Sequence, residues 1–152
     1  MLNIFNLKEK EEYIYEVAKL TYLEWGEKTN LEIQEEKIQR KINKIKNRFN
    51  TENYCKLILL DNDELVGFIS IFPNDCEERK ELFPWYATMY VKKEYRGKGY
   101  SKILNNAILK EAKERNIKRL YLKTDLNNYY EKFGAKYMEK LQNGEKIYYF
   151  DL

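Results

Sequence analysis

The chain has 152 residues, 43% of them hydrophobic and 35% charged, a length and composition that suit one soluble domain. Basic side chains number 28 against 25 acidic ones, so the net charge of +3 describes a mixed surface and does not single out nucleic acid as a partner. Histidine is absent, the two cysteines lie far apart and every apolar run is shorter than a membrane span, so we expect a cytoplasmic protein with no metal site and no membrane partner.

The first fifty residues predict two helices. Residues 8–25 place apolar side chains at helical spacing, and Gly26 follows as a stop signal. A second helix is predicted from about residue 31, with a narrow apolar stripe that suits a surface position. The stripe includes Leu31, Ile38 and Ile45. We expect Trp25 to pack into the core rather than to contact a ligand.

Residues 54–60 and 65–72 are two β-rich runs separated by a polar turn, which predicts an antiparallel hairpin. Pro73 ends the second strand because it cannot donate a hydrogen bond to a sheet. The next segment, residues 74–82, is polar and acidic, and we expect a solvated loop. The loop is also a reasonable place for a carboxylate to meet a cationic ligand, but the sequence does not select one.

The stretch from Trp85 to Ile108 predicts a strand, a glycine turn and a helix. The first turn of a helix has backbone N–H groups without partners and a partial positive charge, which together stabilise an anion. Gly97 and Gly99 permit the positive φ and the close backbone approach that such a site requires. Five basic residues are concentrated here, which favours an anionic ligand. They are Lys92, Lys93, Arg96, Lys98 and Lys102.

The last third of the chain predicts shorter elements. Residues 119–123 suit a short strand, and residues 124–133 suit a short helix that Gly134 ends in a left-handed conformation. Two final β-rich runs flank an Asn-Gly pair at 143–144, which is a strong hairpin signal. Because no repeat or linker divides the chain, we expect a single domain over residues 1–152.

The glycine turn resembles a known cofactor motif. The run Arg96-Gly97-Lys98-Gly99-Tyr100-Ser101 is similar to the acetyl-CoA signature R/Q-x-x-G-x-G/A of the GNAT family of N-acetyltransferases, with Ser101 where Gly or Ala is usual. Three further matches follow the family order: residues 64–68 enter the third strand, residues 85–91 form the central fourth strand, and residues 129–134 match the Y-E-x-x-G segment. The resemblance implies one α/β (α+β) domain. Its mixed, mostly antiparallel, twisted sheet would have six to seven strands, including one at residues 3–5, and about four flanking helices.

The resemblance also implies how the domain is divided. A helical acceptor-side part would cover about residues 1–50, and an acetyl-CoA-binding part about residues 54–152. Backbone groups at the end of the fourth strand would hold the pantetheine arm, and the glycine turn would offer N–H groups to the pyrophosphate. The cofactor-binding residues implied in this way are Met89, Tyr90, Val91, Arg96, Gly97, Lys98, Gly99, Tyr100, Ser101 and Lys102.

Two further positions come from the Y-E-x-x-G segment. Tyr130 would stand beside the cofactor sulfur as the catalytic residue, although it is also one of 14 tyrosines and the alternative is that it packs a helix. Its ordinary pKa of about 10 exceeds the 8.5 or so of a thiol, so we expect a hydrogen bond to the thiolate to outweigh proton transfer. The family often has an Asn seven residues earlier, where this chain has Lys123, so we assign that cofactor contact to Asn127, with Asn128 as the alternative.

These features predict an acyltransferase enzyme that passes acetyl from acetyl-CoA to a primary amine of a small molecule or peptide. We expect direct nucleophilic attack, because no activated Cys or Ser is visible. Without histidine, the base is a carboxylate, a water chain or a tyrosine. The alternative is a non-catalytic acyl-CoA-binding regulatory or sensor module. A nucleic-acid-binding domain is disfavoured because the positive charges converge on one turn.

The sequence leaves the acceptor and the oligomeric state open. Polyamines, aminoglycosides, amino acids, peptide N-termini and protein lysines all carry a suitable amine. Dimers are common in folds of this kind, so a homodimer stays open as well.

Overall fold

One seven-stranded sheet and three α-helices make up the described part of the chain, residues 1–27 and 31–152 of a computed structural model. The strands are β1 (Leu2–Asn6), β2 (Cys55–Asp61), β3 (Glu64–Phe72), β4 (Trp85–Val91), β5 (Arg119–Thr124), β6 (Lys136–Lys140) and β7 (Lys146–Asp151). The α-helices are α1 (Ile14–Trp25), α2 (Leu31–Arg48) and α3 (Tyr100–Glu114). The side chains of residues 31 and 32, and with them the predicted place of Leu31 in an apolar stripe, lie outside the described residues.

The sheet confirms the predicted fold class. Its strand order is β1-β2-β3-β4-β5-β7-β6, and every neighbouring pair is antiparallel except β4 and β5, which are parallel. The predicted first strand is present as β1, and both predicted hairpins form, β2 with β3 and β6 with β7. Gly144 in the Asn-Gly turn has a φ of 94°, the left-handed region that glycine enters without strain.

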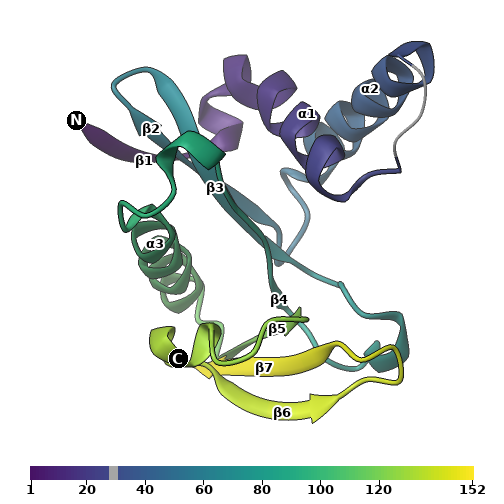
Figure 1. The fold of residues 1–152 in the computed structure, drawn as a ribbon, viewed down its shortest axis with the longest axis vertical. Helices are drawn as coiled ribbons and strands as arrows, with labels where there is room; N and C mark the ends of the chain where they lie inside the picture. Colours follow the sequence, from purple (N-terminus) through teal and green to yellow (C-terminus); the bar gives the residue numbers. More distant parts are fainter. Residues whose placement is uncertain (28–30) are drawn as a thin grey trace.

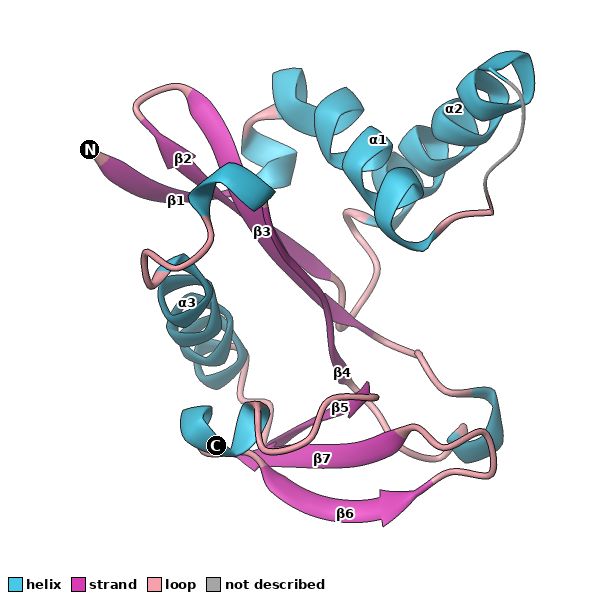
Figure 2. Cartoon of the chain, in the orientation of Figure 1, coloured by secondary structure: helices cyan, strands magenta, loops and turns pink. Residues whose placement is uncertain are grey.

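Helices cover both faces of β2 and β3 (Figure 1, Figure 2). Ile58 and Phe68 pack with α1 and α2 on one face, and Leu57 and Ile69 pack with α3 on the other. Strands buried on both faces need nearly continuous apolar runs, which is why β2 and β3 read as CKLILLD and ELVGFISIF. The middle of the sheet is therefore packed on both faces.

The parallel pair β4 and β5 holds together at one end only. Trp85 pairs with Tyr121, and the Tyr121 N–H donates to the Pro84 carbonyl at 3.1 Å, but no further pair joins the two strands. Figure 1 shows β1 to β4 and β5 to β7 as two arms that meet at this pair. Beyond it the facing edges of β4 and β5 diverge, so backbone N–H and C=O groups in the middle of the sheet are left for another partner.

Two helices differ from their predicted extent. The helix predicted from residue 8 begins at Ile14, because residues 7–9 and 11–13 form 3-10 turns, the first capped by the Asn6 side chain. The helix predicted over residues 124–133 is reduced to one 3-10 turn, Tyr130–Phe133. The Leu126 N–H donates to Thr124 Oγ1 at 3.0 Å, a local turn that competes with helix formation.

The prediction that Trp25 packs into the core is wrong. Its side chain is 51% exposed at the last residue of α1, where the apolar stripe of that helix already ends in the buried Tyr22. Gly26 ends the helix as predicted. The Trp25 ring instead meets the Tyr90 ring edge-on, with 6.3 Å between centroids, and so lies beside the open end of β4.

Candidate active site

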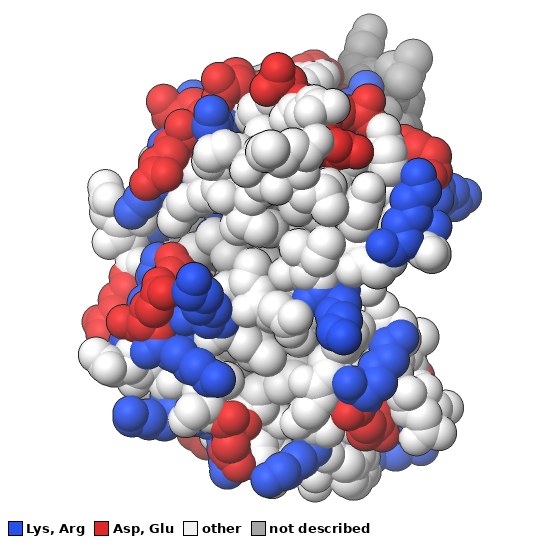
Figure 3. All heavy atoms as spheres, turned by 90° about the vertical axis from the view of Figure 1, so that its left-hand side faces the viewer, with Lys and Arg blue, Asp and Glu red and all other residues white. Residues whose placement is uncertain are grey.

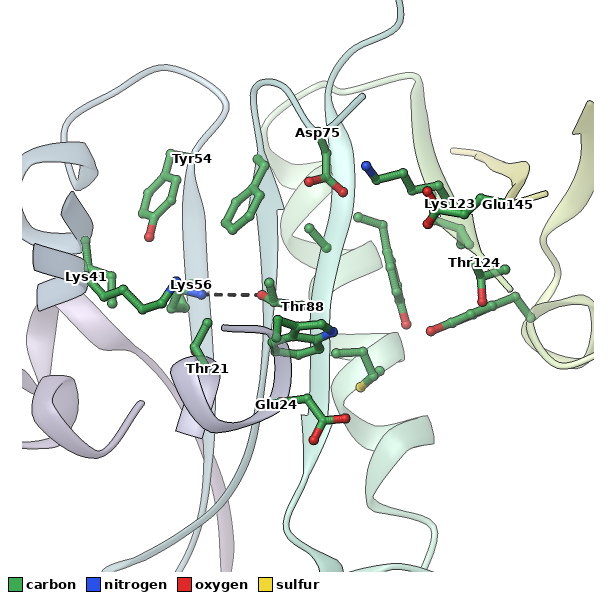
Figure 4. A pocket seen from close by; sticks show the side chains of 18 of the residues that line it. Thr21, Glu24, Lys41, Tyr54, Lys56, Asp75, Thr88, Lys123, Thr124 and Glu145 are labelled. Carbon is green, nitrogen blue, oxygen red and sulfur yellow. Dashed lines mark hydrogen bonds between the residues drawn. The ribbon is translucent and has the colours of Figure 1, made fainter. Parts of the chain in front are cut away.

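A cavity of about 780 Å³ opens where β4 and β5 diverge, and its size suits a small-molecule ligand (Figure 4). Residues 86–89 of β4 and 122–124 of β5 form its floor, since their facing edges are unpaired. The last turn of α1 and one face of α2 form the opposite side. The cavity therefore joins segments that lie more than a hundred residues apart in the chain.

A bulge in β4 faces this cavity. Ser70 pairs with Ala87 and Phe68 with Tyr90, so one residue of β3 opposes two of β4. Thr88, at the bulge, has a φ of 50°, a strained value for a β-branched residue. Its Oγ1 lies 2.6 Å from Ser70 Oγ and 3.4 Å from Lys56 Nζ. These polar contacts hold a backbone distortion that turns β4 toward the cavity.

The glycine turn adjoins the end of β4, as predicted. Gly97 and Gly99 have φ values of 79° and 81°, and the space where a Cβ would stand is open at both. Positive φ, rather than crowding, therefore explains why both positions need glycine. The Arg96 Nε donates to the Val91 carbonyl at 2.8 Å, which ties the turn to the strand. Helix α3 begins directly afterwards at Tyr100, so its free N–H groups face the same turn.

The structure divides the predicted site residues into two adjoining groups. Met89 and Tyr130 line the cavity. Tyr90 and Val91 end β4, and the motif residues Arg96 to Lys102 form the turn and the start of α3 next to it. Asn127 is exposed in the loop after β5 and does not line the cavity, and the same holds for Asn128.

Tyr130 sits in a group of aromatic rings at the β5 side of the cavity. Its ring meets those of Tyr86 and Tyr129 edge-on, at 5.8 and 4.8 Å between centroids. Burial, aided by the nearby Tyr129, raises the pKa of the Tyr130 hydroxyl to about 12. Within the described residues this hydroxyl has no hydrogen-bond partner, so it is available to a ligand. The Tyr86 hydroxyl, by contrast, donates to Asn105 Oδ1 of α3 at 2.8 Å and fixes the floor.

The sequence did not single out a carboxylate in the acidic loop, residues 74–82. In the structure, Asp75 is the carboxylate of this loop that lines the cavity. Figure 4 shows Asp75, Lys123 and Glu145 together on one side of the cavity. Burial raises the pKa of the Asp75 carboxyl to about 6, against the opposing effect of Lys123 and with the support of Glu145. The available signal was position: Asp75 comes two residues after Pro73, close to where β3 ends at the cavity.

Sequence reasoning also missed Lys56 of β2. The side chain is 3% exposed and lines the cavity, where its Nζ donates to Ser70 Oγ at 2.7 Å. It lies over the rings of Phe68 and Phe72, at 5.5 and 5.3 Å from their centroids. Burial lowers its pKa to about 7, and the nearby positive charges of Lys41 and Arg48 act in the same direction. A single lysine in an apolar run gave no sign that it would point inward.

Acidic and basic side chains are interspersed on the face shown in Figure 3. Among the residues that the structure describes, no three acidic or cysteine side chains are grouped so that they could hold a metal ion. None of the described helices is both long and apolar enough to cross a bilayer. The candidate site consists of the cavity and the adjoining glycine turn.

Comparison with known proteins places this geometry in a family. Residues 12–135 match the model of the acetyltransferase (GNAT) family. A probable spermine N(1)-acetyltransferase of Bacillus subtilis subsp. natto is 33% identical over an alignment of 93 residues that covers 55% of this chain and 61% of the relative. The N-alpha-acetyltransferase 30 of Schizosaccharomyces pombe is 32% identical over 82 residues, 51% of this chain and 54% of the relative. The chain thus matches less than two thirds of the length of these curated relatives.

Solved structures share the fold over nearly the whole chain. The PaiA N-acetyltransferase of Thermoplasma acidophilum, solved in complex with coenzyme A, has a TM-score of 0.67 at 22% identity and covers 100% of this chain and 99% of its own. The aminoglycoside 6'-acetyltransferase type Ii has a TM-score of 0.70 at 21% identity and covers 99% and 96%. At these identities the likeness concerns the fold.

Proposed function

The chain belongs to the acetyltransferase (GNAT) family, and from this premise we propose that it transfers an acetyl group from acetyl-CoA to a primary amine by direct attack. The observation that carries the proposal is the continuity of two features. The glycine turn before α3 suits a pyrophosphate, and the cavity between β4 and β5 holds both a carboxylate and a tyrosine. A donor bound at the turn would reach an acceptor bound in the cavity.

The cofactor fits the residues present. Open space beside Gly97 and Gly99, and the first turn of α3, suit the pyrophosphate of acetyl-CoA, which supplies the acyl group as a thioester. The unpaired edge of β4 at Met89 to Val91 suits the amide groups of the pantetheine arm. The bulge at Thr88 would aim backbone N–H groups at a carbonyl oxygen, where they stabilise negative charge as it develops. Asn127 stays a proposed contact at the outer end of this path.

Asp75 is the proposed general base. An alkylamine with a pKa near 10.4 is mostly protonated at pH 7, and its deprotonation there costs roughly 4 to 5 kcal/mol. A carboxylate whose pKa is raised to about 6 by burial is ionised at pH 7 and a better proton acceptor than an ordinary Asp. The amine becomes more acidic as it attacks the carbonyl, so Asp75 can take its proton during bond formation.

Tyr130 is the proposed catalytic residue for the leaving group. With a pKa of about 12 it stays protonated at every working pH and can donate a hydrogen bond to the sulfur. Full proton transfer to a thiolate with a pKa of about 8.5 is uphill by roughly 5 kcal/mol, so the hydrogen bond is the main contribution. A cavity that combines this donor with Asp75 argues against the non-catalytic alternative.

The test is acetyl-CoA binding followed by turnover. A ligand at about a hundred times its Kd adds roughly 2.7 kcal/mol to the free energy of unfolding, a rise in Tm of several degrees. We expect this rise with acetyl-CoA, its reduction in Arg96→Ala, and thiol release when amines are added. Lys110→Ala, on the exposed side of α3, is the matched control. Unchanged Tm at saturating acetyl-CoA would remove the proposal.

A further inference from the structure

The α2 side of the cavity carries positive charge that the proposed acetyl transfer does not use. We propose that Lys56, Lys41 and Arg48 form an anion subsite, so that the acceptor is an amine that also bears a carboxylate or phosphate group. This inference rests on the proposed function, because it names the class of acceptor for that same cavity. It differs from the polycationic acceptor in the name of the spermine relative.

The spacing of residues on α2 directs several cations to one place. Lys41, Lys44 and Arg48 follow each other at three and four residues, which puts them on one face of the helix, and all three line the cavity. Lys56 reaches the same part of the cavity from β2. In Figure 4, Lys41 and Lys56 lie together on the side opposite Asp75 and Glu145. The α2 side of the cavity is thus basic, Asp75 and Glu145 lie across it beside Lys123, and Glu24 lines it from the last turn of α1.

Lys56 is the buried residue of this proposed subsite. Its ammonium is almost wholly buried, and its hydrogen-bond partners, Ser70 and Thr88, are neutral hydroxyls. Among the described residues, no carboxylate forms an ion pair with Lys41, Lys44, Arg48 or Lys56. Isolated charge is costly to bury, and the faces of Phe68 and Phe72 offset only part of the cost. An anion in the cavity would be the missing partner.

The electrostatics of the cluster agree with this reading. The pKa of Lys56 is lowered first by burial and then by two cations, Lys41 and Arg48, and burial lowers the pKa of Lys41 as well. A neighbouring cation lowers the pKa of a lysine when no anion stands between the two. An anion bound between these cations would raise the pKa again. The Arg48 guanidinium also lies over Tyr54 and Phe72, which keeps it directed at the cavity.

The phosphates of the cofactor do not account for these cations. Helix α3, which follows the glycine turn, packs on one face of the sheet, whereas α2 packs on the other. The anionic group therefore belongs to the acceptor. Its amine would lie toward Asp75 and its anion toward Lys56, and a compact molecule with opposite charges at its two ends matches both. A linear polyamine would place a second cation against Lys56.

Matched acceptors test the subsite by binding and by turnover. We would compare 5-aminopentanoate, 3-aminopropyl phosphate and 1,5-diaminopentane, each titrated into the coenzyme A-bound protein by calorimetry and each assayed for thiol release with acetyl-CoA. We expect one of the anionic amines to bind at least tenfold tighter than the diamine and to have the higher kcat/KM. The choice between carboxylate and phosphate is read from the same titrations.

Three variants locate the effect. Lys56→Met and Lys41→Gln should each remove most of the preference for the anionic amine. Lys46→Met removes the same charge from α2 at an exposed position outside the cavity and should keep the preference. Equal or tighter binding of the diamine, or an unchanged preference in both Lys56→Met and Lys41→Gln, would overturn the subsite.

Failure of the subsite and failure of the proposed function are distinguishable. Thiol release with the diamine alone would reject the subsite and leave acetyl transfer standing. If no amine supports thiol release, acetyl transfer fails, but the titrations still decide the subsite, because they need no turnover. Inorganic phosphate should compete with the anionic amine; competition with coenzyme A instead would assign the cations to the cofactor and overturn the proposal.

Discussion

The proposed cofactor side and the proposed acceptor side of this site are built by different means. On the cofactor side, one continuous stretch from β4 through the glycine turn to α3 offers backbone groups, and Gly97 and Gly99 mark it through their positive φ. On the acceptor side, side chains such as Lys56 and Asp75 come from separate segments and act through their burial and charge. A site made of backbone groups can be recognised from a short stretch of sequence. A site made of side chains from separate segments forms only when folding brings those segments together.

The prediction with the largest expected effect concerns Tyr130, which we place where the cofactor side and the acceptor side meet. Tyr130→Phe removes the hydroxyl that we place beside the leaving sulfur, and we expect turnover to fall by roughly 10² to 10⁴ with unchanged acetyl-CoA affinity. Stopped-time thiol release and calorimetry give the two quantities. Tyr129→Phe, whose ring packs against Tyr130 outside the cavity lining, is the control and should stay near the wild-type rate. If Tyr130→Phe turns over as fast as the wild type, the Tyr130 ring only packs against its neighbours and its hydroxyl has no part in catalysis.

A second prediction concerns the energetic cost of the acceptor side. The pKa of Lys56 falls from 10.5 unfolded to about 7 folded, so the folded protein binds fewer protons between these values and its stability rises with pH. Lys56→Met should therefore raise the free energy of unfolding by up to about 4 kcal/mol at pH 7 and by little near pH 10. Denaturant titrations at both pH values measure this. Lys46→Met should show no such pH-dependent gain, and a destabilised Lys56→Met would mean that its hydroxyl contacts outweigh the buried charge.

Asp75 offers a third test, in which activity and stability move in opposite directions. Asp75→Asn should lower kcat/KM about a hundredfold at pH 7 and remove an acidic limb near pH 6. Because the folded pKa is raised, the stabilising protonated form is fully present below about pH 4 and is lost as pH rises through 6. Asp75→Asn should thus be about 3 kcal/mol more stable than wild type at pH 8 and nearly equal to it at pH 3.5. If the pH profile of Asp75→Asn keeps its acidic limb, another group is the general base.

The same contrast explains which features could be predicted from the sequence. The apolar, β-rich runs of β2 and β3, the Asn-Gly hairpin and the glycine turn are local patterns, and the structure confirms them. The position of Trp25 could not be predicted, because its helical spacing is the same whether or not a sheet extends beneath the end of α1. The direction of Lys56 depends on which face of β2 meets α2, a property of the assembled fold. Such choices are settled by tertiary packing, which local patterns do not encode.

The prediction with the smallest expected effect tests whether the proposed cofactor side and acceptor side are independent of each other. Gly99→Val forces a β-branched residue into a φ of 81°, a strain of about 1 to 3 kcal/mol that changes the glycine turn and leaves the cavity lining untouched. We expect acetyl-CoA affinity to fall about tenfold while binding of the acceptor amine stays constant. Calorimetry with each ligand alone separates the two. Gly99→Asn, which tolerates left-handed backbone better, should recover most of the affinity. If Gly99→Val weakened both ligands equally, the turn would be supporting β4 and its bulge, and the two sides would form one mechanical unit.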